Sequence, residues 1–339
     1  MNTKFKIAII IFIQIATSTI FSQDYIKYST RINEAEYFII NKNYERALGI
    51  YDSLFNEYEF IYARNAFTAC QLAAYISDSL IFEKCLDKCF LAGIDINVLS
   101  ISPIISKMKS KNEWISTIPR YRILNQKYIS KIDTILKKRV DNLSAIDQKY
   151  TRRCNMFFGF AYPFFYRKAN KTYSQLVDSL LLIYNEKGVL PHERNIGISF
   201  KYNLSVKKDS LNIIKGNFDF SNQKVILILL HNQSNEKLIK SNFLLENLEK
   251  GYLKPDDYAS IIDFYAKYGS NNDFKNISYN QHFRDYDSTN WININNRRKI
   301  IGLESFELLR AKEQRSIDIL KTSIINCDYN YIKLWKRFY

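Results

Sequence analysis

The chain has 339 residues, of which 47% are hydrophobic, so it is long enough for two compact units and too apolar for intrinsic disorder. It contains only 9 glycines and 5 prolines, and such sparse turn punctuation argues against a many-stranded sandwich or barrel. The sequence therefore predicts a mostly α protein with long helices joined by short loops.

The formal net charge is +15 and the pI is about 9.3, and proteins that bind nucleic-acid phosphates are often this basic. Here the basic residues occur in short groups scattered among acids, for example at 137–139, 152–153 and 297–299. A solvated basic surface explains this distribution, and we expect no nucleic-acid partner.

The first 22 residues have the three parts of a secretory signal peptide. Lys4 and Lys6 precede an apolar run from Ile7 to Ile15, and small and polar residues follow up to Ser22. The apolar run is shorter than the ~20 residues of a spanning helix. We expect cleavage near Ser22, which places the mature chain in the periplasm or outside the cell with no membrane span. An uncleaved anchor is the alternative.

Four amphipathic segments follow, and they pair into two helical hairpins. They are predicted at 24–41, 44–58, 60–76 and 78–92, and segments at 97–108 and 111–118 are expected to close the array. Ala47 and Phe82, which hold matching places in the two hairpins, stand 35 positions apart, close to the 34-residue tetratricopeptide period.

Small and aromatic residues recur at matching places of the two hairpins: Ala35, Phe38, Ala47 and Tyr51 in the first, and Cys70, Ala73, Phe82, Leu86 and Cys89 in the second. In this respect residues 23–118 resemble tetratricopeptide repeats. The resemblance implies a protein or peptide partner on a concave surface of this module. An unrelated helical bundle is the alternative, because any two similar hairpins can produce such a period.

Residues 119–290 are predicted to form a second helical domain, followed by a helical extension over 291–339. Its helices are expected at 119–153, opening at Pro119, and at 174–187, 236–250 and 255–268. Alternating residues at 199–206 predict a strand or one arm of a small β hairpin. The apolar run from Val225 to Leu230 could be a strand, but its position before two clear helices favours a buried helix.

Two titratable residues stand out in this second domain. Asp147 interrupts an apolar stripe of helical spacing formed by Leu136, Val140, Leu143 and Tyr150. Because an unpaired buried charge costs several kcal/mol, Asp147 must either pair with a cation or line a cleft. His231 ends the apolar run, so a buried segment delivers its imidazole to the edge of a core.

Several short motifs occur in order between residues 143 and 283: Asp147-Gln148 with Arg152, Gly188 and Pro191 with Gly197, Leu230-His231, and Gly251 ahead of Tyr258-Ala259 and Asp263. In this order they resemble the uncharacterised bacterial family called domain of unknown function 6624. Phe264 departs from the family's pattern, which has Arg there, and residues 279–282 only loosely match its last element. The family has no established chemistry, so the resemblance implies a set of residues and no reaction.

The candidate catalytic residues are Asp147, His231 and Asp263, and the candidate binding residues are Gln148, Arg152 and His282. Imidazole and carboxylate groups suit a general base oriented by an acid, or a divalent metal site. No dedicated ligand spacing, phosphate loop or nucleophile elbow occurs in the sequence, and we predict no cofactor and no metal.

Each candidate also has a structural explanation. A satisfied histidine at the end of a core segment accounts for His231. Salt-bridged loop structure accounts for His282, because acids and an arginine surround it. His192 is expected in a solvated loop, and Asp263 is expected to point away from the apolar face of its helix.

Two functions follow from these observations. The preferred hypothesis is a protein-interaction or scaffold module, and the rival is a hydrolase-like or metal-dependent enzyme with its site around Asp147 and His231. The distance between the Asp147 and His231 side chains discriminates between the two hypotheses. Hydrogen-bond reach in an open cleft favours the enzyme, whereas separation by more than about 10 Å, or burial without a pocket, excludes it.

Overall fold

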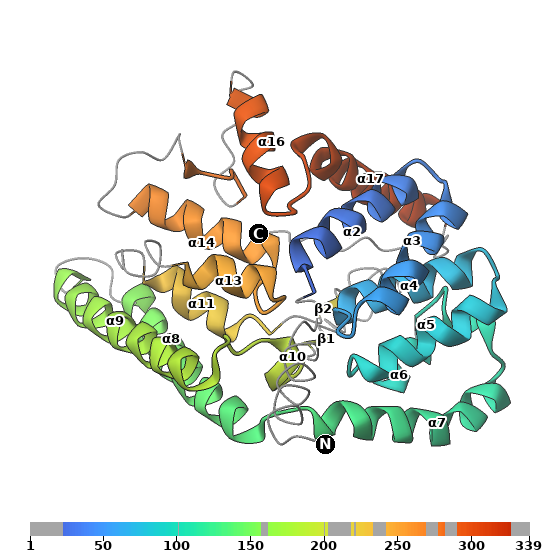
Figure 1. Ribbon diagram of the computed structural model, residues 1–339, viewed down its shortest axis with the longest axis horizontal. Coiled ribbons are helices and arrows are strands. Elements are labelled where there is room, and N and C mark those ends of the chain that lie inside the picture. The colour runs from blue at the N-terminus through green and yellow to red at the C-terminus, as the bar shows by residue number, and fades with distance from the viewer. Residues whose placement is uncertain are drawn as a thin grey trace, which may run out of the picture.

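The computed structural model describes residues 23–100, 102–156, 162–199, 201–202, 218–219, 222–232, 242–268, 277–281 and 290–326. Its elements are mostly helices, which confirms the predicted fold class (Figure 1). Two short strands, β1 (Lys201–Tyr202) and β2 (Phe218–Asp219), pair antiparallel, and β1 lies within the alternating segment 199–206. The predicted signal peptide and His282 lie outside the described residues.

The first part of the chain forms two antiparallel helical hairpins, α2 (Tyr25–Ile40) with α3 (Tyr44–Glu57), and α4 (Ala63–Tyr75) with α5 (Ser79–Leu91). Three of these helices begin where Asp24, Asn43 or Asp78 accepts hydrogen bonds from backbone amides of the first turn. The hairpins share one aromatic-rich core, and α4 is buried along nearly its whole length. The hairpin predictions are confirmed to within three residues at each end.

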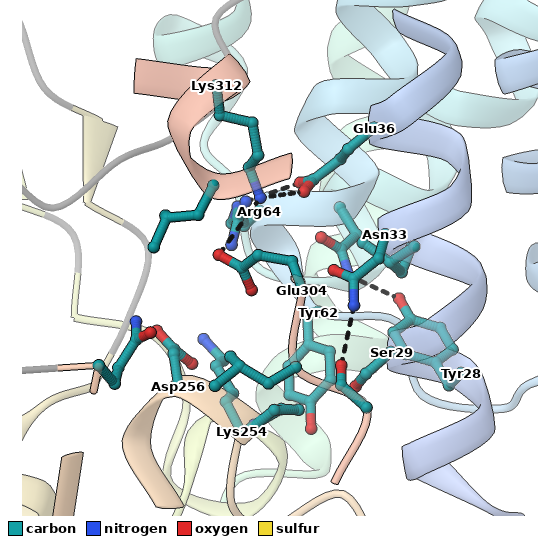
Figure 2. Close-up of a pocket in the computed structure, with 17 residues that line it drawn as sticks. Tyr28, Ser29, Asn33, Glu36, Tyr62, Arg64, Lys254, Asp256, Glu304 and Lys312 are labelled. Atoms are coloured by element: carbon teal, nitrogen blue, oxygen red, sulfur yellow. Dashed lines mark hydrogen bonds and ion pairs between the residues drawn. The ribbon is translucent and has the colours of Figure 1, made fainter. Parts of the chain in front are cut away.

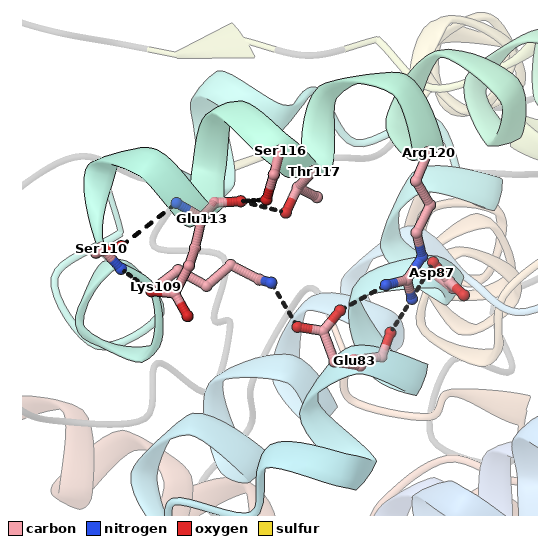
Figure 3. Close-up of polar contacts among 8 residues, drawn as sticks. All are labelled: Glu83, Asp87, Lys109, Ser110, Glu113, Ser116, Thr117 and Arg120. Atoms are coloured by element: carbon pink, nitrogen blue, oxygen red, sulfur yellow. Dashed lines mark hydrogen bonds and ion pairs between the residues drawn. The ribbon is translucent and has the colours of Figure 1, made fainter.

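The helix boundary predicted at Pro119 is wrong. Helix α7 (Lys111–Ser130) is continuous, with Pro119 on its exposed side. Its start is set by Ser110 and Glu113, which form a capping box, and this signal outweighs the preference of proline for a first turn (Figure 3). The chain turns only after Ser130, where Asp133 caps α8 (Thr134–Met156).

Helix α7 packs onto the N-terminal hairpins through three apolar side chains, Trp114, Tyr121 and Leu124. Arg120 adds ion pairs with Glu83 and Asp87 of α5, each at an N–O distance of 2.5 Å (Figure 3). The preceding segment, predicted as helical over 97–108, contains only the short α6 (Ile96–Ser100) and the 3-10 turn η1 (Ser106–Met108). The N-terminal core therefore continues past residue 118, where the domain boundary was predicted.

A second core is built around α11 (Lys224–His231), which confirms that the apolar run is a buried helix. Helix α11 packs against α8, α9 (Tyr162–Lys187) and α14 (Pro255–Tyr268). Helix α9 begins at Tyr162 instead of the predicted Ser174, and α14 has the predicted bounds. Within the described residues of this half lie also α10 (Glu193–Ile196) and α13 (Phe243–Glu249), the latter inside the predicted 236–250.

The C-terminal helices return to the N-terminal hairpins (Figure 1). Helix α16 (Trp291–Ile300) precedes α17 (Phe306–Asn326), and α17 packs against α2. Between them the backbone carbonyl of Gly302 accepts a hydrogen bond from Asn33 of α2 at 2.9 Å. Helices α2 and α4 are thus covered in part by the chain's own second half. None of the described helices is both long and apolar enough to cross a bilayer.

Candidate functional site

Helix α8 carries Asp147 into the second core. Leu136 and Val140 precede it on the same stripe and are fully buried, and Asp147 itself is 0% exposed. A buried carboxylate needs hydrogen-bond partners, and the sequence predicted that Asp147 either pairs with a cation or lines a cleft. Its Oδ2 accepts a hydrogen bond from Gln148 Nε2 at 2.9 Å, and its Oδ1 lies 2.7 Å from Nδ1 of His231.

The contact between Asp147 and His231 joins two helices whose residues are 84 positions apart. A carboxylate accepts hydrogen bonds, so Nδ1 of His231 is the donor, and in the neutral ring Nε2 carries the lone pair. The His231 side chain is 25% exposed whereas that of Asp147 is 0% exposed. The pair therefore has a buried acid that orients the ring and an imidazole that solvent can reach.

Thr151 and Tyr173 also lie beside this pair, and neither was predicted from the sequence. The Thr151 hydroxyl donates to the Asp147 carbonyl at 3.1 Å and lies 3.4 Å from His231 Nδ1 and 3.1 Å from the Tyr173 hydroxyl. The Tyr173 ring lies against the imidazole, with centroids 5.4 Å apart and planes inclined by 36°. Thr151 follows Asp147 by one helical turn, so helical spacing alone could have identified it. Tyr173 comes from α9, and only the packing of α9 on α8 brings it here.

Asp263 is not part of this pair. It is 0% exposed, so the expectation that it points away from the core is wrong. Its Oδ1 accepts hydrogen bonds from the Ser278 hydroxyl at 2.8 Å and the Tyr279 amide at 2.7 Å, and its Oδ2 accepts from the Gln281 amide at 2.5 Å. Asp263 thus holds the segment 277–281 against α14, which is a structural role.

Two further residues named from the sequence, Arg152 and His192, make no hydrogen bond or ion pair with Asp147 in the part of the chain that the structure describes. Arg152 is exposed on α8, and His282 lies outside the described residues. His192, expected in solvent, is 4% exposed, and its ring meets that of Tyr62 edge-on at 5.7 Å. Burial, followed by the positive charges of Lys254 and Arg194, holds the pKa of His192 well below its usual value, so this ring is neutral.

The grouping of Asp147, Thr151, Tyr173 and His231 is suited to proton transfer. A neutral imidazole whose Nδ1–H is held by a carboxylate can accept a proton at Nε2, and the imidazolium that forms is stabilised by the same carboxylate. In the described part of the chain, no three His, Cys, Asp or Glu side chains lie close enough together to hold a metal ion.

Comparison with known proteins adds no further information: no family model matches the chain, and neither a curated protein nor a solved structure matches it.

Proposed function

We propose that this protein is an enzyme that uses His231 as a general base oriented by Asp147, and that its reaction is of the hydrolytic, proton-abstracting class. The observation that carries the proposal is the 2.7 Å contact between the imidazole and a fully buried carboxylate, which meets the distance part of the criterion. The His231 side chain is 25% exposed, and neither residue lines the cavity described below. Keeping an ionised acid in a core costs free energy, and an exposed or apolar residue at position 147 would avoid that cost. Orienting the imidazole of His231, which solvent can reach, would give the buried Asp147 a function that justifies this cost.

The position of the contact on the ring also suits a base. Nδ1 is engaged with Asp147, so the basic lone pair is on Nε2. The Tyr173 ring packs beside the imidazole and limits its rotation. A base held in one orientation contributes about 10²–10⁴-fold to the rate of a proton transfer.

The test compares the wild type with two variants. His231→Asn keeps a side-chain N–H that can reach Asp147 but removes the basic nitrogen, and Asp147→Asn keeps the shape of the acid but cannot orient the ring. All three are assayed at neutral pH with nitrophenyl carboxylate esters, phosphate esters and glycosides. We expect the wild type to hydrolyse one of these classes, and both variants to lose about 10²-fold or more.

His192→Phe is the matched control, because it removes the other described histidine from a position outside the site. Circular dichroism establishes that each variant is folded. A His231→Asn protein that is folded and as active as the wild type would refute the proposal, and so would a wild type that hydrolyses none of the three classes.

The second candidate function is protein binding by the N-terminal hairpins. Two stacked antiparallel hairpins support it, and so does an apolar stripe on α7 whose Ile115, Ile123 and Ile129 side chains are each more than half exposed. Helices α2 and α4 contact the chain's own C-terminal segments, which leaves the outer helices and α7 for a partner.

Affinity capture tests this second candidate. The wild type and an Ile115→Ser/Ile123→Ser variant are used as baits in envelope extracts. We expect a protein that the wild type retains and the variant does not, because burial of exposed apolar side chains drives most protein association. Equal recovery by the two baits would exclude a role for α7.

The two family resemblances and the export of the chain remain proposals that rest on the sequence. Mass spectrometry of the protein purified from its native host tests export directly. A mature chain that begins close to Gln23 supports a periplasmic or secreted protein, whereas one that retains Lys4 and Lys6 supports the uncleaved anchor.

A further inference from the structure

A cavity of about 110 Å³ lies between the N-terminal hairpins and the second half of the chain. Its walls come from α2, α4, the start of α14 and the segment that leads into α17, and no residue of the Asp147 site lines it (Figure 2). An apolar cavity of about 150 Å³ admits benzene. This cavity therefore has room for a ligand of about six heavy atoms or fewer.

Four of the charged side chains around the cavity form one neutral group. Glu36 Oε1 accepts a hydrogen bond from Arg64 at 2.7 Å, and Lys312 Nζ pairs with the other oxygen of Glu36. Lys312 Nζ also lies 3.7 Å from Glu304 Oε1. Two acids and two bases thus compensate one another at this end of the cavity, where Figure 2 shows Glu36, Arg64 and Lys312 together.

The other end of the cavity carries the carboxylate of Asp256, which forms no ion pair with a cation that the structure describes. Lys254 Nζ lies 3.0 Å from Glu193 Oε2, an acid outside the cavity lining, so that pair is also neutral. Asp256 lines the cavity from the first turn of α14, and it is half-buried. Its carboxylate makes no hydrogen bond or ion pair with any residue that the structure describes, although it is close enough to the Arg64 guanidinium to attract it electrostatically. Together with Glu193, the described charged groups around the cavity are four acids (Glu36, Glu193, Asp256, Glu304) and three bases (Arg64, Lys254, Lys312), so negative charge is in excess by one.

The rest of the lining is suited to an alkyl chain. Ile32, Leu303 and Leu309 are buried and face the cavity, and Pro255 lies beside them. An ammonium group is the complement of a lone carboxylate, because it brings one positive charge and three hydrogen-bond donors. Binding of an anion is disfavoured, since Arg64, Lys254 and Lys312 are each already paired with an acid.

We propose that this cavity is a binding site for a small aliphatic primary amine, whose ammonium group contacts Asp256 and whose chain packs against Ile32, Leu303 and Leu309. The site is separate from the His231 site, and the proposal does not depend on the function proposed for that site.

The experiment uses the full chain and three ligands of matched size: propylamine, propanol and propionate. Binding is measured by isothermal titration calorimetry at neutral pH. We expect saturable binding of propylamine and none of the other two, because only the amine supplies a cation. This comparison needs no variant, so it stands even where a substitution unfolds the protein.

Two variants then locate the ligand. Asp256→Asn keeps the shape of the side chain and removes its charge, and we expect it to bind propylamine about tenfold or more weakly, as loss of a charge-assisted hydrogen bond implies. Asp178→Asn is the matched control, because Asp178 is exposed on α9, outside the cavity, and its removal changes the net charge equally. We expect it to bind as the wild type does.

Three results would overturn the proposal. They are tighter binding of propionate than of propylamine, equal affinity of the wild type and folded Asp256→Asn for the amine, and no saturable binding of any ligand by the wild type.

Discussion

The ion pair between Glu36 and Lys312 is buried and links the two ends of the described chain. It joins α2 to α17 across 276 positions of sequence, and the side chains are 2% and 6% exposed. Glu36 also accepts a hydrogen bond from Arg64. Glu36→Gln removes the negative charge and leaves the buried Lys312 ammonium with the more distant carboxylate of Glu304, at 3.7 Å.

Breaking a buried ion pair from one side costs about 3–5 kcal/mol. Glu304 compensates part of the Lys312 charge, and Arg64 is 27% exposed and can be partly rehydrated, so we expect the lower end, about 3 kcal/mol. In a chain of this length, about 2 °C of the melting temperature corresponds to each kcal/mol, which gives a decrease of roughly 6 °C.

Thermal unfolding followed by far-ultraviolet circular dichroism measures this change. The matched control is Glu57→Gln, because Glu57 pairs with Arg31 on the same hairpin but is 45% exposed, and such a surface pair contributes at most about 1 kcal/mol. The double variant Glu36→Leu/Lys312→Met removes both charges and should recover most of the stability. If Glu36→Gln melts within about 2 °C of Glu57→Gln, the assignment of a buried, stability-determining pair is refuted.

Three further predictions concern single residues. Burial alone would raise the pKa of Glu304, but nearby cations, led by Lys312, hold it at about 2. Because this pKa is lower in the folded than in the unfolded chain, the ionised Glu304 should contribute up to about 3 kcal/mol to the free energy of unfolding above pH ~4.5. That contribution is lost as the pH falls toward ~2. The free energy of unfolding of Glu304→Gln should therefore fall less steeply than that of the wild type over this range. His192 is buried in its neutral form, so stability should fall as the pH drops below ~6.5, and His192→Phe should remove that slope in melting temperatures measured between about pH 7 and 5. Gly302 has φ +71°, and an added Cβ would lie 2.6 Å from a backbone oxygen, so Gly302→Ala should destabilise the protein by about 2 kcal/mol or more in urea unfolding, whereas Gly49→Ala, with nothing within 4 Å, should gain about 0.5–1 kcal/mol. Equal midpoints for the two glycine variants would contradict this account.

Local sequence patterns were sufficient for the four helices of the N-terminal hairpins and for α11. Apolar residues at helical spacing identify the face of a helix that packs against a core, whichever elements form that core. The helices of the hairpins and the buried helix at 225–230 were therefore predicted correctly. The error at Pro119 arose because two local signals compete. Proline is favoured in the first turn of a helix, but the capping box at Ser110 and Glu113 starts α7 earlier and leaves Pro119 on the exposed side of the helix.

The candidate site was predicted in part. The pattern identified Asp147 as a buried acid that needs a partner, and it identified His231 at the edge of a core. It could not pair them, because the distance between α8 and α11 depends on which helices cover which faces. The burial of His192, the use of Asp263 as a clamp for 277–281 and the placement of Tyr173 beside His231 were beyond local patterns for the same reason.

By itself, the sequence determined the helical class, most helix positions and the requirement that Asp147 be paired, because these follow from periodicity and from the cost of burying a charge. Only the tertiary structure decided that the partner is His231, that α17 returns to α2, and that Asp256 lines a cavity between the two halves of the chain. The physical reason is that each of these contacts joins residues far apart in the chain. Their proximity depends on how whole helices pack, and no local window of sequence contains that information.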